Sequence, residues 1–473
     1  MTSDRRRWLA LAAVCLGVVM VVLDTTVVNV ALPAIRADLG FDDTSLVWVV
    51  NAYMLFCGGC LLLGGRLGDL HGQRRVFVLG VVLFTLASAA CGFAASQGVL
   101  VGARAVQGLG GAVVEAVSLA LITTLFSDTE GRAKAMGVYG FVCAAGGSIG
   151  VLVGGVLVQA LDWHWIFLVN VPIGIAVCAL VWALVPADAS GTPGRRLDVA
   201  GAVLVTSAMM TAVVAVVGGN AHGWLSLRTL GLLALAVVLF VAFVAVEARV
   251  AQPLVPLGLL RLPNLRVANI AAVLWSAAMF AWFFLSALYM QLVLGWDALA
   301  IGLAFLPGNV AMAVCSLGIS AKLVLRFGLR APLTVGLLLA ALGLALFARA
   351  PVDGTFWLDV LPGMLLTGLG AGIGFNPLLL AAMGDVREEE AGLASGIVNT
   401  SFLLGGALGL AGLASLGDAR TGALLAAGVE RTAALAGGYR LAFGAGAVAA
   451  LLAAAVGGLG LRVPKAVGPP DPA

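Results

Sequence analysis

The sequence predicts an all-α integral membrane protein with fourteen spanning helices. Of its 473 residues, 62% are hydrophobic and only 10% are charged, whereas soluble domains are about 25% charged. The apolar residues form long continuous runs, each near the roughly 20 residues with which a helix crosses a bilayer. A transmembrane barrel would instead need alternating segments of about ten residues. These observations predict helices and no strands.

Short stretches with glycine, proline or charge separate the apolar runs. The fourteen expected spans cover residues 8–31, 45–64, 76–95, 99–126, 134–158, 165–186, 198–218, 229–249, 268–292, 300–320, 331–349, 357–383, 391–416 and 438–461. The first span follows basic residues, as the core of a signal peptide does, but it is too long for a cleaved leader and contains Asp24. We therefore expect it to remain as a membrane helix.

Basic residues favour one side of the membrane. Most of the 26 lysine and arginine residues fall in alternate connections, for example 5–7, 74–75 and 195–196. The side with the excess is expected to be cytoplasmic. Because fourteen is even, both termini are predicted to lie on that side, in a multi-pass protein of the inner (plasma) membrane. The net charge of +3 and the lack of a basic tract argue against nucleic acid as a partner.

Three motifs occur twice, in the same order and about 260 residues apart. The pairs are "GRLGDLHGQRRV" (65–76) with "AKLVLRFGLRAP" (321–332), "QGLGGA" (107–112) with "TGLGAG" (367–372), and "MGVYGFVCAAGGSIG" (136–150) with "SGIVNTSFLLGGALG" (395–409). The repeat predicts an N-terminal six-helix bundle over 1–186, a two-helix insert over 187–262 and a C-terminal six-helix bundle over 263–473. Parallel halves of this kind are typical of transporters, whose substrate site lies between them near the midplane.

Four motifs resemble those of the major facilitator superfamily, and within it the fourteen-span drug–proton antiporters. They are "LDTTVVNVALP" (23–33), "GRLGDLHGQRR" (65–75), "RAVQGLGGA" (104–112) and "DWHWIFLVNVPIG" (162–174). The resemblance covers about residues 8–461 and implies the major facilitator fold, with two six-helix bundles plus two inserted helices. It also implies a cytoplasmic gate built on Gly65, Asp69, Gly72 and Arg74, for which a local turn cap at Asp69 is the alternative.

The fifth span carries glycines at steps of four residues, Gly146, Gly150 and Gly154, with Gly155 beside them. Small residues on one face let helices approach closely. The resemblance implies that this is the antiporter packing face between the two halves, and ordinary tight helix packing is the alternative. Val151 stands where the motif of that family usually has proline.

Three charged residues lie deep inside expected spans, five or more residues from either end: Asp24, Arg104 and Glu115. A charge at bilayer depth costs at least about 2.5 kcal/mol, so it usually has a function. A rise of about 1.5 Å per residue puts Asp24 and Arg104 at a similar depth and puts Glu115 about 16 Å from Arg104 along the helix axis. A rotation of about 100° per residue puts Glu115 on the same helix face as Arg104. We assign proton coupling to these three residues, and the sequence leaves open which acid carries the proton. A fixed Asp24–Arg104 ion pair and a tolerated polar Glu115 are the alternatives.

Candidates for a substrate cavity are Asn29, Gln107, Glu115, Trp282 and Gln291. Six aromatic residues crowd the ninth span between 275 and 289. We expect most of them at the lipid face, and the remainder lining an apolar pocket beside Gln291. Such a pocket suits lipophilic, planar or cationic molecules.

The sequence favours a proton-coupled antiporter that exports lipophilic, cationic or neutral small molecules. The alternative is a translocator of lipids or amphiphiles on the same fold. The seven cysteines lie in apolar runs and the three histidines in loops, so we expect no metal site, no cofactor beyond the proton gradient and no enzymatic activity. The expected partners are a small lipophilic substrate, protons and the lipid bilayer, and the protein is expected to act as a monomer.

Overall fold

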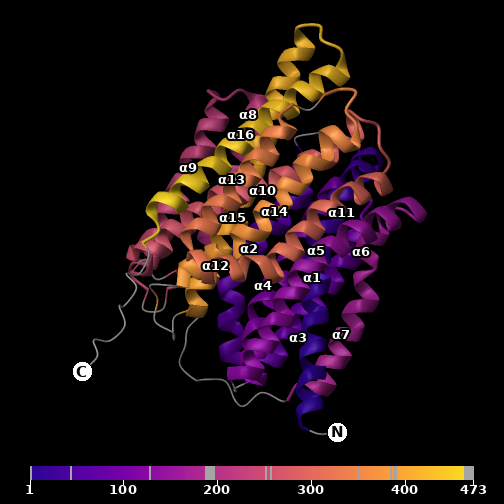
Figure 1. The fold of residues 1–473 in the computed structure, drawn as a ribbon. Helices are drawn as coiled ribbons and strands as arrows, with labels where there is room; N and C mark the ends of the chain where they lie inside the picture. The colour runs from indigo at the N-terminus through magenta and orange to yellow at the C-terminus, as the bar shows by residue number, and fades with distance from the viewer. Residues whose placement is uncertain are drawn as a thin grey trace.

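The computed structural model describes residues 3–42, 45–126, 129–186, 198–250, 253–255, 258–349, 351–383, 386 and 391–462. Regular structure within these ranges is entirely helical (Figure 1), which confirms the all-α class. The helices are α1 (Ser3–Leu39), α2 (Val47–His71), α3 (Gln73–Gly92), α4 (Gln97–Leu125), α5 (Thr129–Ala160), α6 (Trp165–Leu168), α7 (Asn170–Leu184), α8 (Val199–His222), α9 (Leu227–Glu247), α10 (Pro263–Leu292), α11 (Ala298–Val314), α12 (Ser320–Phe327), α13 (Arg330–Phe347), α14 (Leu361–Met383), α15 (Ala391–Ala426) and α16 (Arg431–Gly460), with short turns η1 (Leu259–Arg261), η2 (Cys315–Ile319) and η3 (Phe356–Val360).

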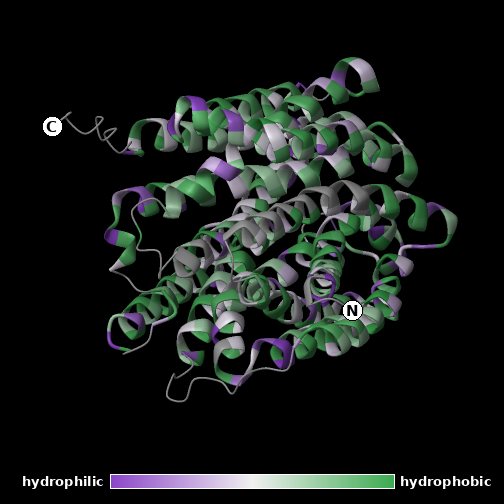
Figure 2. Ribbon diagram, turned by 60° about the horizontal axis from the view of Figure 1, so that its bottom comes forward, coloured by the Kyte–Doolittle hydropathy of each residue, from purple (hydrophilic) through white to green (hydrophobic). Residues whose placement is uncertain are grey.

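These elements make fourteen long rods. The short α6 leads into α7, η2 joins α11 to α12, and η3 opens α14. In the described ranges, 13 rods are long and apolar enough to cross a membrane, and the 32-residue α5 is the remaining one. The chain is therefore a multi-pass membrane protein. Apolar residues cover the outside of the bundle as well as its interior (Figure 2), as expected for a surface that faces lipid.

Several helices extend beyond the predicted spans, most clearly at the end of the chain. Residues 417–437 were expected to connect two spans, but α15 continues to Ala426 and α16 begins at Arg431 (Figure 1, yellow hairpin at the top). The segment contains no proline, and its alanine and leucine residues favour helix. Gly428, with a φ of 80°, allows the turn, and the Glu430 carboxylate accepts hydrogen bonds from the first amides of α16. These bonds, together with one from the Thr432 hydroxyl, lower the pKa of Glu430.

The sequence repeat is matched by repeated packing. Helix α1 packs on α5 and α7, as α10 packs on α15 and α16. Helix α4 packs on α2 and α3, as α14 packs on α11 and α13. The two sets of helices meet along two seams, one between α2 and α15 and the other between α5 and α11. In the first seam the Asn51 amide donates to the carbonyl of Ala407 at 3.0 Å.

The inserted helices α8 and α9 lie beside the first seam. Helix α9 packs on α8, and α8 contacts both α2 and α15. The Asn220 amide at the end of α8 donates to the carbonyl of Ser415 at 2.6 Å. At the other contact, a Cβ at Gly59 would collide with the Thr206 hydroxyl. Helix α8 therefore touches both halves.

Glycines of the repeated "GLG" motif allow α4 to pack closely on α2 and α14 to pack closely on α11. A methyl group at Gly108 would collide with the carbonyl of Tyr53 on α2, and one at Gly368 with the carbonyl of Gly308 on α11. Gly108 and Gly368 occupy equivalent places in the two copies. The same backbone contact is therefore built twice.

We predict that Gly108→Ala and Gly368→Ala each destabilise the protein by about 1–3 kcal/mol, the usual cost of overpacking. Gly102→Ala is the matched control, because Gly102 lies on α4 with open space around its Cβ position. Thermal unfolding in detergent is the measurement. Equal melting temperatures for Gly108→Ala and Gly102→Ala would contradict this account of the packing.

Candidate functional site

A closed polar cluster lies inside the N-terminal helices. It consists of Asp24 on α1, Ser88 on α3, Arg104 and Gln107 on α4, and Asn170 on α7. No member is more than 1% exposed. Such a group is tolerated inside a membrane bundle only if its polar atoms satisfy one another.

Asp24 is the centre of this cluster. Its Oδ2 forms an ion pair with Nη1 of Arg104. Its Oδ1 accepts from the amide of Gln107 at 2.7 Å and from that of Asn170 at 3.2 Å. The carboxylate therefore accepts from three donors, one of them charged.

Arg104 is held as firmly. Its Nε donates to the carbonyl of Val49 on α2 at 2.9 Å, and its Nη1 also donates to Oε1 of Gln107 at 2.6 Å. Its guanidinium carbon lies 4.5 Å from the ring centroid of Tyr53, a distance at which a cation is attracted to an aromatic face. The structure thus brings Asp24 and Arg104 together and satisfies both charges.

Two members of the cluster were not singled out from the sequence. The Ser88 hydroxyl accepts from the amides of Gln107 at 2.8 Å and Asn170 at 2.9 Å and donates to the carbonyl of Phe167. Asn170 stands in the motif at the start of the sixth span, where an amide among apolar residues was the available signal. Ser88 gave no such signal, because serine is common in membrane helices.

Glu115 lies in a different environment. It is partly exposed, and among the described residues its carboxylate accepts one hydrogen bond, from the Cys57 thiol at 3.9 Å. Among the residues that the structure describes, no lysine or arginine forms an ion pair with it. In the described part of the chain it is thus an acid at membrane depth without a compensating cation.

Tyr53 lies between these two environments. Its ring contacts Arg104, and its hydroxyl lies so close to Gly111 that a Cβ there would sit 2.5 Å away. Gly111 precedes Glu115 by four residues and so shares its helix face. The hydroxyl is buried and has no hydrogen-bond partner among the described residues. Tyr53 was not singled out from the sequence, although a tyrosine in an apolar span was a usable signal.

The expected gate residues surround the end of α2. Gly72, with a φ of 94°, separates α2 from α3, and Gly65 leaves room beside Ala116 of α4. Arg74 donates to the carbonyl of Trp182 at 2.7 Å and stacks its guanidinium 4.3 Å from that ring. The side chain of Asp69 lies outside the described part of the structure, so its role as a latch remains a prediction.

The glycines of α5 face two different helices. Cβ atoms at Gly146, Gly150 and Gly154 would strike Val22, Thr26 and Val27 of α1, in the same half. Of these four glycines only Gly155 faces the other half, where a Cβ would lie 2.9 Å from the carbonyl of Ala298 at the start of α11. Helix α5 is continuous through Val151, as expected without the usual proline.

The remaining cavity candidates are scattered. Asn29 is buried, and its amide donates to the carbonyl of Thr25 on its own helix. Gln107 belongs to the closed cluster. Oε1 of Gln291 is buried without a hydrogen-bond partner in the described ranges, as is Nε1 of Trp282.

The expectation that most aromatic residues of the ninth span face lipid is wrong. Five of the six are at most 6% exposed in α10: Trp275, Trp282, Phe283, Phe284 and Tyr289. Helix α10 packs on α14, α15 and α16 and also touches α1. It therefore has protein on several sides, so its aromatic residues pack inside the bundle.

Metal chemistry finds no support in the part of the chain that the structure describes. No group of three histidine, cysteine or acidic side chains lies close enough there to hold a metal ion. Cys57 is a free thiol next to Glu115.

Comparisons with known proteins agree with this architecture. Residues 14–410 match the family model of the Major Facilitator Superfamily. The chain is 39% identical over 426 residues to a puromycin resistance protein of Streptomyces alboniger, covering 89% of this chain and 84% of the relative. It is 40% identical over 405 residues to a cephamycin export protein of Amycolatopsis lactamdurans, covering 85% and 83%. A solved bacterial homologue of the human lysosomal transporter Spinster, inward-facing and unoccupied, aligns over 97% of both chains with a TM-score of 0.66 and 18% identity, which shows a common fold.

The closed cluster yields a prediction about stability. Asp24→Asn should destabilise the protein by about 3–5 kcal/mol, because it leaves the Arg104 charge buried and uncompensated. The double variant Asp24→Asn/Arg104→Gln should recover most of that loss. Unfolding in detergent, with Glu115→Gln as the control that removes an acid without a paired cation, is the measurement. If Asp24→Asn proves as stable as Glu115→Gln, the ion pair is not the structural centre of this half.

Proposed function

Since the chain belongs to the major facilitator superfamily, we propose that it exports small lipophilic drugs or antibiotics, cationic or neutral, by alternating access in exchange for protons. The chain is a transporter and not an enzyme. Two relatives that match it over more than four fifths of both chains bear the names of antibiotic resistance and export proteins. Their names support antibiotics as the class of substrate.

The observation that carries proton exchange is the contrast between the two acids. Asp24 is fully buried and neutralised by Arg104, whereas Glu115 is partly exposed and forms no ion pair among the described residues. A carboxylate in a low-dielectric site favours whatever neutralises it, either a proton or a cation. Glu115 is therefore the acid at which protons and cationic substrates compete.

This competition accounts for exchange between the two sides. When the site is open to the outside, Glu115 takes up a proton. When the site is open to the cytoplasm, the proton leaves and a cationic substrate takes its place. Because Glu115 and Arg104 share one face of α4, a change at Glu115 acts on the helix that also holds the Asp24 cluster. Asp24 and Arg104 contribute to the coupling of proton and substrate transport because their ion pair keeps α1 and α4 together as this half moves.

We propose that the moving parts are the two six-helix halves, 1–186 and 263–473, which rock against each other along the α2–α15 and α5–α11 seams. The insert, 187–262, accompanies them through α8. The gate of Gly65, Asp69, Gly72 and Arg74 closes the cytoplasmic side, on which both termini lie. A single chain contains both halves and is sufficient for the cycle.

We predict that Glu115→Gln lowers efflux of neutral chloramphenicol, because the exchanged proton is lost, and lowers efflux of the cation ethidium about tenfold further, because ethidium also loses the carboxylate that binds it. A tenfold difference corresponds to about 1.4 kcal/mol, close to the lower end of the range for a hydrogen bond to a charged group. Asp24→Asn should lower efflux of both compounds. Cells with matched expression of each variant are loaded with one compound, and its loss is followed with and without an uncoupler.

The uncoupler separates the proposal from its alternative. An uncoupler should stop efflux by the wild-type protein, whereas a translocator of lipids or amphiphiles without proton coupling would be unaffected. Equal loss of both compounds in Glu115→Gln would place Glu115 on the proton path alone, and no loss of either would remove it from the mechanism.

A further inference from the structure

Three aromatic side chains form a group in the C-terminal half. Trp282 and Phe283 lie on α10 and Phe305 on α11. The rings of Phe283 and Phe305 are stacked, with centroids 5.5 Å apart and planes 17° from parallel. The Trp282 ring lies 4.4 Å from Phe283 and 6.0 Å from Phe305 and is tilted against both.

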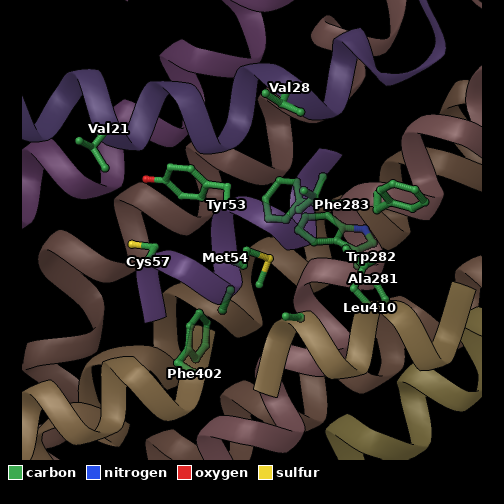
Figure 3. Close-up of a cluster of buried hydrophobic side chains, with 14 of the residues drawn as sticks. Val21, Val28, Tyr53, Met54, Cys57, Ala281, Trp282, Phe283, Phe402 and Leu410 are labelled. Carbon is green, nitrogen blue, oxygen red and sulfur yellow. The ribbon is translucent and has the colours of Figure 1, made fainter. Parts of the chain in front are cut away.

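This aromatic group lies where the two halves meet. Helix α10 touches α1, its counterpart in the sequence repeat. Figure 3 draws Trp282 and Phe283 in one cluster of buried side chains with Val28 of α1 and Met54 of α2. Helices at this junction separate when a transporter of this architecture opens, because the substrate site lies between the repeats. The group is therefore covered in this structure but accessible in an open one.

The indole N–H of Trp282 has no hydrogen-bond acceptor among the described residues, although the side chain is only 1% exposed. Buried tryptophan N–H groups usually find a partner, and an unmet buried donor costs about 1–3 kcal/mol. Phenylalanine rings offer no lone pair. The acceptor that this donor lacks must come from outside the group.

Building on the proposed export function, we infer that Trp282 selects substrates that combine a planar aromatic ring with a carbonyl oxygen in or beside the ring plane. The ring stacks against Phe283 and Phe305, and the carbonyl oxygen accepts the hydrogen bond of the indole. The N–H edge of an indole carries positive charge and repels cations, whereas its face attracts them. A ring carbonyl is thus recognised separately from the cation, which Glu115 recognises.

The test compares the binding of two cations, each with a planar aromatic ring system, to the purified protein in detergent. Doxorubicin carries quinone carbonyls in its ring plane, and ethidium has no carbonyl. Trp282→Phe keeps an aromatic ring but removes the N–H. We expect Trp282→Phe to weaken doxorubicin binding about tenfold, equivalent to about 1.4 kcal/mol, and to change ethidium binding by less than about twofold, both measured by ligand fluorescence.

Trp275→Phe is the matched control, because Trp275 is equally buried on the same helix and lies outside the group. It should leave the binding of both ligands unchanged. Equal weakening of doxorubicin and ethidium in Trp282→Phe would show that Trp282 only fills space and would overturn the inference, as would unchanged binding of both or no binding by the wild-type protein. Because binding needs no gradient, a wild-type protein that binds with this selectivity but does not transport would contradict the proposed function and leave the inference standing.

Discussion

The ion pair between Asp24 and Arg104 is the interaction around which the N-terminal helices are arranged. Asp24 comes from α1 and Arg104 from α4, and they form further hydrogen bonds with Gln107, Asn170 and the carbonyl of Val49 on α2. In a membrane interior such a pair is stable only if every donor and acceptor is met. The cluster therefore fixes the relative positions of these helices.

The fixed position of α4 bears on the role of the second acid, Glu115. Helix α4 carries both the paired Arg104 and Glu115, for which the described residues show no ion pair. Asp24 already has Arg104 as its counter-ion, whereas in the proposed cycle Glu115 exchanges a proton for a cation. The seam along α2 lies next to Glu115 through Cys57. The proposed chemistry and the proposed motion thus meet at one place, while the Asp24 cluster stays intact.

Much of the fold could be predicted because membrane helices are recognised in a sequence by their length and apolar composition. The fourteen rods and the family follow from that signal and from local motifs. The pairing of Asp24 with Arg104 was a hypothesis from depth alone, and the structure places the two in contact. Details that depend on neighbours could not be predicted: which way the aromatic residues of α10 face, that Gly146, Gly150 and Gly154 pack on α1, and that Ser88 completes the cluster. The sequence of a helix shows which of its faces are apolar and which are polar, but not which helix packs against each face.

The most direct test of the account is whether binding of a cation displaces a proton. Purified protein in weakly buffered detergent is mixed with ethidium between about pH 6 and 8, and a pH indicator reports released protons. If Glu115 holds either a proton or a cation, ethidium should release up to about one proton per molecule bound, and Glu115→Gln should release none. Ethidium binding to the wild-type protein without any proton release across this range would contradict the account.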